Sequence, residues 1–298
     1  MAAATTPVGR DRALALGAAL VTVGFWASAF VGIRSAGRDL SPGALTLGRL
    51  LVASVVLGVV VLIRREPLPE RRDVPALLFL GVLWFGVYNL ALNAAEQSID
   101  AGTASMLVNI GPILIAVLAG FVLHEGFPRP LVAGCAIAFA GVIVIGIATT
   151  DQGVDAGWGA VLCLVAALAY ATAVVAQKPL LARVSGLQVT FLACAIGTIA
   201  CLPFAPTLVD ELGSAGGPAI RWTVYLGVFP TALAFTTWAY ALSKTTAGRM
   251  GATTYLVPPL VILMGWLILD EVPPGLALVG GALCLIGVVV ARRSPGPR

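Results

Sequence analysis

Long apolar runs alternate with short polar segments along almost the whole chain. A helix that crosses the hydrocarbon core of a membrane needs roughly 20 mainly apolar residues, and ten runs of this kind occur. We therefore predict ten transmembrane helices at residues 14–33, 43–63, 74–93, 102–123, 131–149, 158–177, 187–205, 219–242, 247–269 and 275–291. The segments between them, such as RREPLPERRD and DEVPPG, are rich in charged residues, proline and glycine, as loops are.

The composition agrees with a membrane protein and excludes several other classes. Of the 298 residues, 59% are hydrophobic and 11% are charged, and the mean hydropathy is +0.99; soluble domains average about 45–50% apolar and about 25% charged residues. The basic residues behind the net charge of +4 are scattered, so no nucleic-acid partner is expected. The five cysteines all fall inside apolar runs without ligand spacing, so no metal, cofactor or disulfide is implied.

The basic residues predict how the chain crosses the membrane. The first apolar run is too long for the core of a signal peptide, so it is expected to be the first membrane helix. With the N-terminus inside, fourteen of the 18 lysines and arginines fall in inner segments and three in outer ones, while Arg49 lies within the second run. Lys and Arg concentrate in cytoplasmic loops. We therefore predict a multi-pass protein of the bacterial inner membrane with both termini in the cytoplasm.

The sequence repeats itself about halfway. A shift of 146 residues brings Pro112 onto Pro258, and a shift of 144 brings Arg34 onto Lys178. Each half holds five predicted helices, an odd number, so the halves must enter the membrane in opposite orientations. Inverted repeats are a recurrent plan of secondary transporters, with the substrate site where the halves meet. The predicted fold is an all-α integral membrane protein of two inverted five-helix repeats, 1–150 and 151–298, around a central cavity.

Segments in both halves carry a family resemblance. They are FWASAFVGIR in the first run, LTLGRL in the second, and LHEGFPRPLVAGCAIAFAGVIV and ILDEVPPGLALVGGALCLIGVVV at the ends of the two halves. In order and spacing, from about residue 14 to residue 291, the chain resembles the EamA family of the drug/metabolite transporter superfamily. The resemblance implies a ten-helix fold of two repeats and the export of small metabolites, often amino acids or their relatives. It does not fix the substrate.

Polar residues within the predicted helices are the candidates for a binding site, because a polar group that faces lipid is costly. Arg49 could contact a carboxylate or act as a gate, or could be a structural arginine that bonds backbone carbonyls. Asn89, Asn93 and Glu96 make a polar stripe on the third helix, suited either to a pocket or to contacts between helices. The aromatic candidates could instead lie at the membrane interface. The full set of cavity candidates is Trp26, Ser28, Arg49, Trp84, Tyr88, Asn89, Asn93, Asn109, Tyr170, Trp238 and Tyr255.

Matched prolines and glutamates have separate expected roles. Pro112 and Pro258 lie at equivalent positions in the middle of predicted helices, where proline permits a bend, so they are candidate hinges or else packing kinks. Glu125 and Glu271 precede the last helix of each half. We expect them to cap helix N-termini, with proton coupling as the weaker alternative.

These features favour a secondary transporter that exports a small metabolite, such as an amino acid or a related amphipathic compound, by alternating access. The alternative is an uncoupled facilitator or channel-like pore. Multidrug efflux and a membrane enzyme are less favoured. An enzyme is not expected, because the single histidine and short loops supply no catalytic or metal-binding set. The expected partners are a small-molecule substrate and the lipid bilayer, with protons as a candidate coupling ion. The protein is expected to act as a monomer or a weak homodimer.

Overall fold

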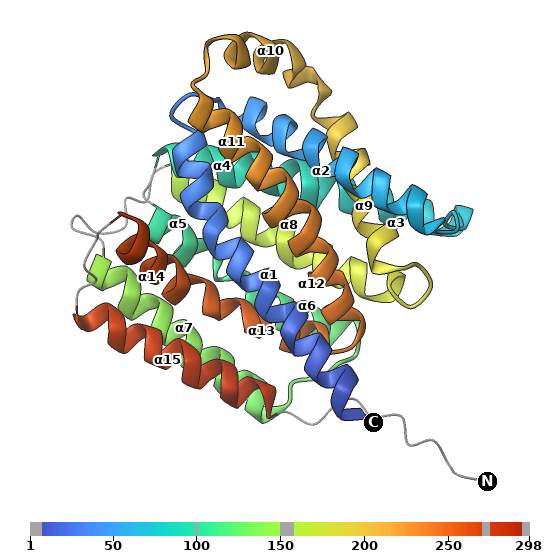
Figure 1. Cartoon of the computed structure of the whole chain (residues 1–298). Helices are drawn as coiled ribbons and strands as arrows, with labels where there is room; N and C mark the ends of the chain where they lie inside the picture. The colour runs from blue at the N-terminus through green and yellow to red at the C-terminus, as the bar shows by residue number, and fades with distance from the viewer. Residues whose placement is uncertain (1–7, 99–100, 150–157, 270–274, 294–298) are drawn as a thin grey trace.

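The computed structural model describes residues 8–98, 101–149, 158–269 and 275–293, and every regular element in these ranges is helical. In chain order the elements are α1 (Val8–Ala36), α2 (Pro42–Arg64), η1 (Arg71–Asp73), α3 (Val74–Leu80), η2 (Gly81–Tyr88), α4 (Asn89–Ser98), α5 (Ala101–Val108), α6 (Gly111–Val122), α7 (Arg129–Thr149), α8 (Trp158–Leu180), α9 (Gly186–Ala200), η3 (Leu202–Phe204), α10 (Ala205–Ser214), α11 (Gly217–Leu226), η4 (Gly227–Leu233), α12 (Ala234–Ser243), α13 (Ala247–Thr253), η5 (Thr254–Leu256), α14 (Val257–Leu269) and α15 (Gly275–Arg292). Figure 1 shows how they pack.

The helices are apolar enough for a membrane, which confirms the all-α membrane class. Within the described ranges, four helical stretches are each long and apolar enough to span a bilayer, or five when the α9–α10 pair, bent by 53°, is taken as one span. Shorter apolar helices, among them Gly111–Val122, add to this set. The predicted span 102–123 becomes α5 and α6, and the predicted span 247–269 becomes α13, η5 and α14. The π-helical turns η2 and η4 also interrupt the predicted spans 74–93 and 219–242.

One helix was missed by the sequence analysis. Residues 206–218 were predicted to be a loop, but α10 occupies most of this segment and lies across the end of the bundle (Figure 1). Two of its apolar side chains, Leu208 and Val209, point in different directions, the first buried and the second exposed. Glu211 of α10 accepts a hydrogen bond from the Ser41 amide at 2.8 Å, ahead of α2. The segment was too short and too acidic to satisfy a search for membrane-spanning runs.

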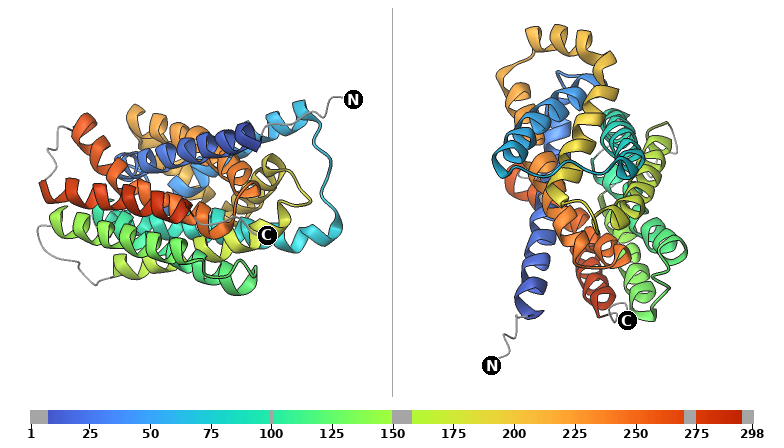
Figure 2. Two further views of the ribbon diagram at one scale, coloured as in Figure 1. Left: turned by 90° about the horizontal axis from the view of Figure 1, so that it is seen from below. Right: turned by 90° about the vertical axis from the view of Figure 1, so that its right-hand side faces the viewer.

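The helices α7 and α15 pack side by side and antiparallel (Figures 1 and 2). A Cβ atom added at Gly287, near the end of α15, would lie 2.5 Å from the amide nitrogen of Ala138, in the middle of α7. A Cβ atom added at Gly141 would lie 2.6 Å from the carbonyl oxygen of Gly280. Small residues of this kind let helix backbones approach closely in a membrane, where dispersion contacts replace the hydrophobic effect.

Two further antiparallel pairs form the body of the protein. Ser54 of α2 and Thr198 of α9 share a hydrogen bond of 2.9 Å between their hydroxyl oxygens. In α1, the hydroxyl oxygen of Thr22 lies 2.8 Å from that of Thr237 of α12, while Ser28 pairs at 2.7 Å with the hydroxyl of Tyr225 from α11. Since a later residue of α1 meets an earlier residue of the other segment, α1 runs against it.

The close contact of α7 with α15 gives a first prediction. Gly141→Ala should place a methyl group against the Gly280 carbonyl and lower the free energy of unfolding by roughly 1–3 kcal/mol, the usual cost of overpacking. In detergent this should appear as a fall in the melting temperature of about 5 °C. The matched control is Gly281→Ala, whose added Cβ would meet Pro259 at an ordinary 3.4 Å. Equal melting temperatures for the two variants would contradict the described packing.

Candidate functional site

Two π-helical turns, η2 and η4, begin 146 residues apart at Gly81 and Gly227 and border the centre of the protein. A π-turn alters the regular backbone ladder, and such turns often occur at functional sites. Side chains supply hydrogen bonds here. The side-chain amide of Asn89 donates to the carbonyl oxygens of Trp84 at 3.1 Å and Phe85 at 3.0 Å. The hydroxyl of Thr231 donates to the carbonyl oxygen of Leu226 at 2.8 Å. Each turn is therefore stabilised by a polar residue.

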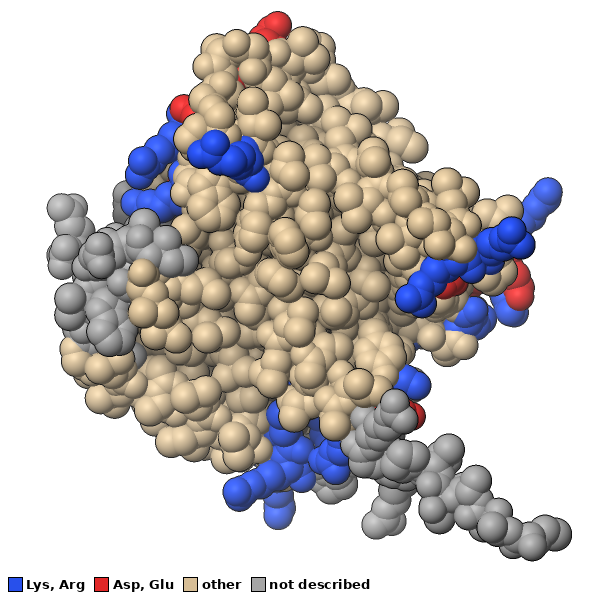
Figure 3. Space-filling model, in the orientation of Figure 1, with Lys and Arg blue, Asp and Glu red and all other residues tan. Residues whose placement is uncertain are grey.

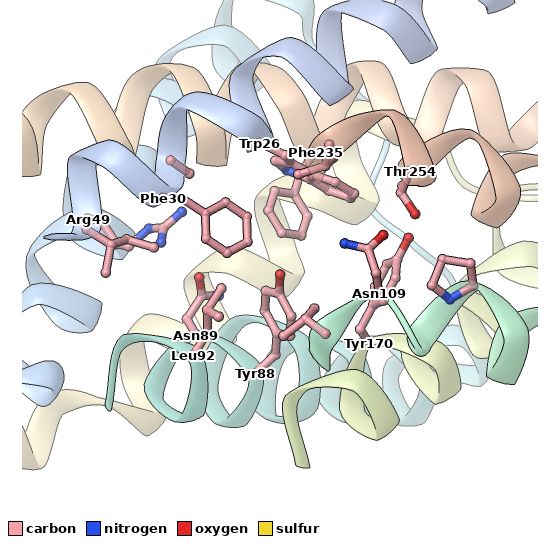
Figure 4. A pocket seen from close by; sticks show the side chains of 15 residues that line it. Trp26, Phe30, Arg49, Tyr88, Asn89, Leu92, Asn109, Tyr170, Phe235 and Thr254 are labelled. Carbon is pink, nitrogen blue, oxygen red and sulfur yellow. The ribbon is translucent and has the colours of Figure 1, made fainter. Parts of the chain in front are cut away.

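A cavity lies beside these turns and measures about 600 Å³ with open solvent included (Figure 4). Its walls come from both halves of the chain. Seven of its residues were named from the sequence, namely Trp26, Arg49, Tyr88, Asn89, Asn109, Pro112 and Tyr170. The others are Ala29, Phe30, Ile33, Leu92, Val108, Phe235, Thr254 and Val257.

Aromatic rings make the middle of the cavity wall. Trp26 of α1 is at their centre, with its ring centroid 5.3 Å from that of Phe235 and 6.0 Å from that of Tyr170. Trp84 and Trp238 form a layer behind them and do not line the cavity; their centroids lie 6.4 Å and 4.9 Å from Trp26. The wall is aromatic and largely apolar, and it suits a flat or flexible apolar group.

One end of the cavity carries a buried cation. Figure 4 shows Arg49 and Asn89 at this end, with Phe30 next to them. Arg49 is only 3% exposed, and its Nε donates to the hydroxyl oxygen of Thr231 at 3.1 Å. Its two terminal nitrogens have no hydrogen-bond partner within the described ranges. A buried guanidinium without a carboxylate is costly, so this end of the cavity favours an anionic group.

The other end of the cavity is polar but uncharged. Asn109, Tyr170 and Thr254 point toward one another there (Figure 4). The amide nitrogen of Asn109 donates to the carbonyl oxygen of Ser105 at 2.6 Å, which fixes the orientation of the side chain. The cavity thus has a cationic end, an aromatic middle and a neutral polar end.

Several sequence candidates lie elsewhere. Ser28 faces Tyr225 in the α1–α11 contact, and Tyr255 is fully buried in the cluster with Cys135 and Cys284 around α7 and α15. Neither they nor Pro258 line the cavity, although Pro112, the counterpart of Pro258, does.

The two glutamates also differ from expectation in detail. The carboxylate of Glu125 accepts hydrogen bonds from the amides of Ala247 at 2.8 Å and Gly248 at 3.1 Å, so it caps α13 and not the helix that follows it in the chain. Glu271 lies outside the described residues.

Two cavity residues, Phe30 and Phe235, were missed that the sequence could have indicated. Phe30 follows Trp26 by one helical turn, so it shares the same face of α1. A shift of 146 places Asn89 on Phe235 and Val108 on Thr254, and all four line the cavity. Applying the repeat to the candidate Asn89 would have found Phe235, whereas Thr254 is the counterpart of Val108, which was not a candidate.

A second hollow, here called the vestibule, lies next to the cavity and opens at the end of α1. It measures about 1130 Å³ with open solvent included, and its lining residues are Ile33, Arg34, Gly37, Arg38, Asn93, Glu96, Gln97 and Ser98. Ile33 lines both spaces. Asn93, a sequence candidate, therefore belongs to the vestibule, where its amide donates to the Thr46 hydroxyl oxygen at 2.9 Å. Blue atoms gather over this end of the molecule in Figure 3.

Comparison with known proteins identifies the type of molecule. The EamA-like transporter family matches the chain twice, at residues 13–147 and 157–293. A probable terminal-alkyne amino-acid exporter of Streptantibioticus cattleyicolor is 38% identical over 286 residues, which is 95% of each chain. An uncharacterized transporter of Bacillus subtilis is 33% identical over 89% of this chain and 87% of its own. A probable amino-acid metabolite efflux pump of Salmonella typhimurium is 26% identical over 91% and 92%.

A solved crystal structure shares the fold, with a TM-score of 0.77 and 21% identity over 94% of this chain and 98% of the other. The matching family and relatives are named as transporters, which confirms the expectation that the chain is not an enzyme. Membership of a transporter family also implies that the chain is a multi-pass membrane protein and that its substrate is a small molecule. The chain belongs to the EamA-like transporter family, within the drug/metabolite transporter superfamily.

Proposed function

We propose that this protein is a secondary transporter of the bacterial inner membrane that exports an amino acid or a related amphipathic compound by alternating access. The observation that carries the proposal is the cavity itself, in which the buried cation Arg49 and an aromatic wall around Trp26 lie at the contact of the two halves. An amino acid has a carboxylate that can bind Arg49 and a side chain that can pack against the aromatic wall. The exporter at 38% identity and the efflux pump at 26% support this class of substrate.

The inverted-repeat arrangement is part of the proposal. In two bodies related by a two-fold axis, a residue touches its own counterpart only near the axis. Cys284 donates to the carbonyl oxygen of Ala138 at 3.5 Å, and these residues are 146 positions apart. Ser54 and Thr198, which share a hydrogen bond, are 144 positions apart, the other shift found in the sequence. Both pairs lie between antiparallel helices, as an axis in the membrane plane requires.

Ten spans follow from this arrangement. They are α1, α2, the stretch from η1 to α4, α5 with α6, α7, α8, α9, α11 through α12, α13 with α14, and α15. Residues 1–150 and 151–298 then form the two repeats, in line with the two family matches. The excess of basic residues in the inner segments supports a cytoplasmic position for both termini. We propose a monomer or weak homodimer, with protons as the candidate coupling ion.

Bending at two divided spans would change access to the cavity. Pro112 follows the break between α5 and α6, and Pro258 follows the break between α13 and α14. Proline lacks the amide hydrogen that a helix interior needs, so a bend at these positions loses no additional hydrogen bond. The two sites are therefore the proposed hinges of the alternating-access motion.

Counterflow in proteoliposomes tests the transport function. Vesicles with purified protein, loaded with a mixture of unlabelled apolar amino acids, should accumulate the ¹⁴C-labelled mixture transiently and saturably. A carrier gives this result because the internal solute speeds the return of the binding site. Linear flux without counterflow would show a channel or facilitator, and no flux in any vesicle would refute amino-acid export. An imposed pH gradient in the same vesicles tests proton coupling.

Arg49 should recognise a carboxylate. Arg49→Gln is expected to weaken the apparent affinity for amino acids about tenfold or more, a loss of roughly 1.4 kcal/mol or greater. The amines that lack only the carboxyl group should bind the variant and the parent protein equally, as measured by the shift in melting temperature. If the variant loses both ligand types equally, Arg49 has a structural role through Thr231 and not a role in binding.

Trp26 should supply the apolar contact. Trp26→Ala removes the centre of the aromatic wall and should raise the apparent KM for apolar amino acids about tenfold, while glycine, which has no side chain to bury, should be little affected. Trp158→Ala is the matched control, because Trp158 is 70% exposed at the start of α8 and does not line the cavity. Similar KM values for the two variants would exclude the proposed wall.

A further inference from the structure

Lys178, near the end of α8, fixes the turn between α12 and α13. Its ammonium group donates to the carbonyl oxygens of Leu242 at 2.7 Å and Thr245 at 2.6 Å. Carbonyls at the end of a helix have no partner within the helix, and a cation stabilises them. On the other side of the same turn, Glu125 holds the first amides of α13. The α12–α13 turn is thus closed from two directions.

Arg34 has the position in the first half that Lys178 has in the second, since a shift of 144 aligns them. The two lie at opposite ends of the molecule, because α1 is antiparallel to α12 and Lys178 binds the end of α12. Their environments differ. Arg34 is exposed at the vestibule and makes no hydrogen bond or ion pair with the described residues.

Glu96 is the acidic residue among those that line the vestibule beside Arg34. A shift of 146 places it on Leu242, one of the two residues that Lys178 binds. It is 8% exposed, and neither carboxylate oxygen has a hydrogen-bond partner in the described ranges. Arg34 and Arg49 are the cations that act on it electrostatically. A buried carboxylate without a partner is costly, so a cation that reached Glu96 would be strongly stabilised.

We infer that Arg34 and Glu96 form a gate that closes the vestibule when the contact of Lys178 with the α12–α13 turn opens. The inference rests on the proposed transport function and names the residues that perform it. In the structure the Lys178 end is closed and the Arg34 end is open. In the opposite state the end of α1 approaches the end of α4, and the Arg34 guanidinium donates to the Glu96 carboxylate. In one state Lys178 binds the α12–α13 turn and Arg34 is unpaired, and in the other state Arg34 binds Glu96 and Lys178 is unpaired.

The two contacts should therefore compete, which can be measured without substrate. Gln97→Cys provides a reporter in the vestibule, where a membrane-impermeant maleimide reaches it while the gate is open; the five native cysteines are all buried. Lys178→Gln should favour the state with a closed vestibule and slow labelling about threefold, a shift of roughly 0.7 kcal/mol. Adding Arg34→Gln or Glu96→Gln should restore the parent rate.

Matched variants separate this gate from general effects of charge. Arg38→Gln removes another vestibule arginine, one turn beyond Arg34 and without a repeat counterpart among the basic residues, and it should not restore labelling in the Lys178→Gln background. Lys244→Gln removes an exposed lysine beside the same α12–α13 turn and should not slow labelling. Arg34→Lys should keep the gate, since lysine serves at the matched position.

Two labelling results would overturn the gate. One is an unchanged labelling rate in the Lys178→Gln variant, provided that its melting temperature in detergent shows a folded protein. The other is equal restoration by Arg34→Gln and Arg38→Gln. Counterflow of the ¹⁴C-labelled amino-acid mixture separates the two proposals. If the parent protein shows none, the proposed export fails whatever the labelling shows. If the parent transports and Arg34→Gln transports equally fast, only the gate fails.

Discussion

The hydrocarbon core of a membrane requires every backbone polar group within it to find a partner inside the protein. This requirement explains why every regular element of the described chain is a helix, and it also explains where the helices are irregular. At η2 and η4 the regular ladder changes, and the side chains of Asn89 and Thr231 bind carbonyl oxygens there. Those same turns border the cavity. Irregular backbone thus occurs where side chains can compensate it, and the proposed substrate site lies beside it.

Much of the fold follows from hydropathy and from the repeat. The apolar runs predicted the membrane class, and nearly every one coincides with a helix or a chain of helices. The divided spans at Asn109 and Thr254 could not be located from hydropathy, because a break in a helix leaves the apolar composition unchanged. Helix α10 was not predicted from hydropathy for a related reason. It lies across the end of the bundle and only one face of it is buried, so its sequence is not a continuous apolar run.

The cavity was predictable only in part. Residue type pointed to Arg49, Asn89 and Tyr88, because charged, amide and aromatic groups within an apolar run need a reason to be there. It could not separate Trp26, which lines the cavity, from Trp238, which lies behind it and donates to Gln177 at 3.2 Å. That difference depends on how each helix is rotated about its axis. Helix rotation is set by packing against neighbours from the other half, and a single sequence does not show it.

The pairs Ala138 with Cys284 and Ser54 with Thr198 have a consequence for how the halves can diverge. In the proposed arrangement the halves meet as two subunits of a symmetric dimer do, through the same surface patch on each. A position on the axis then faces its own copy, so its size and polarity must be self-compatible. Away from the axis, each half is free to differ, as Arg34 differs from Lys178. Small residues and hydroxyls are therefore fixed on the axis, while charges that distinguish the two faces of the membrane are kept at the periphery.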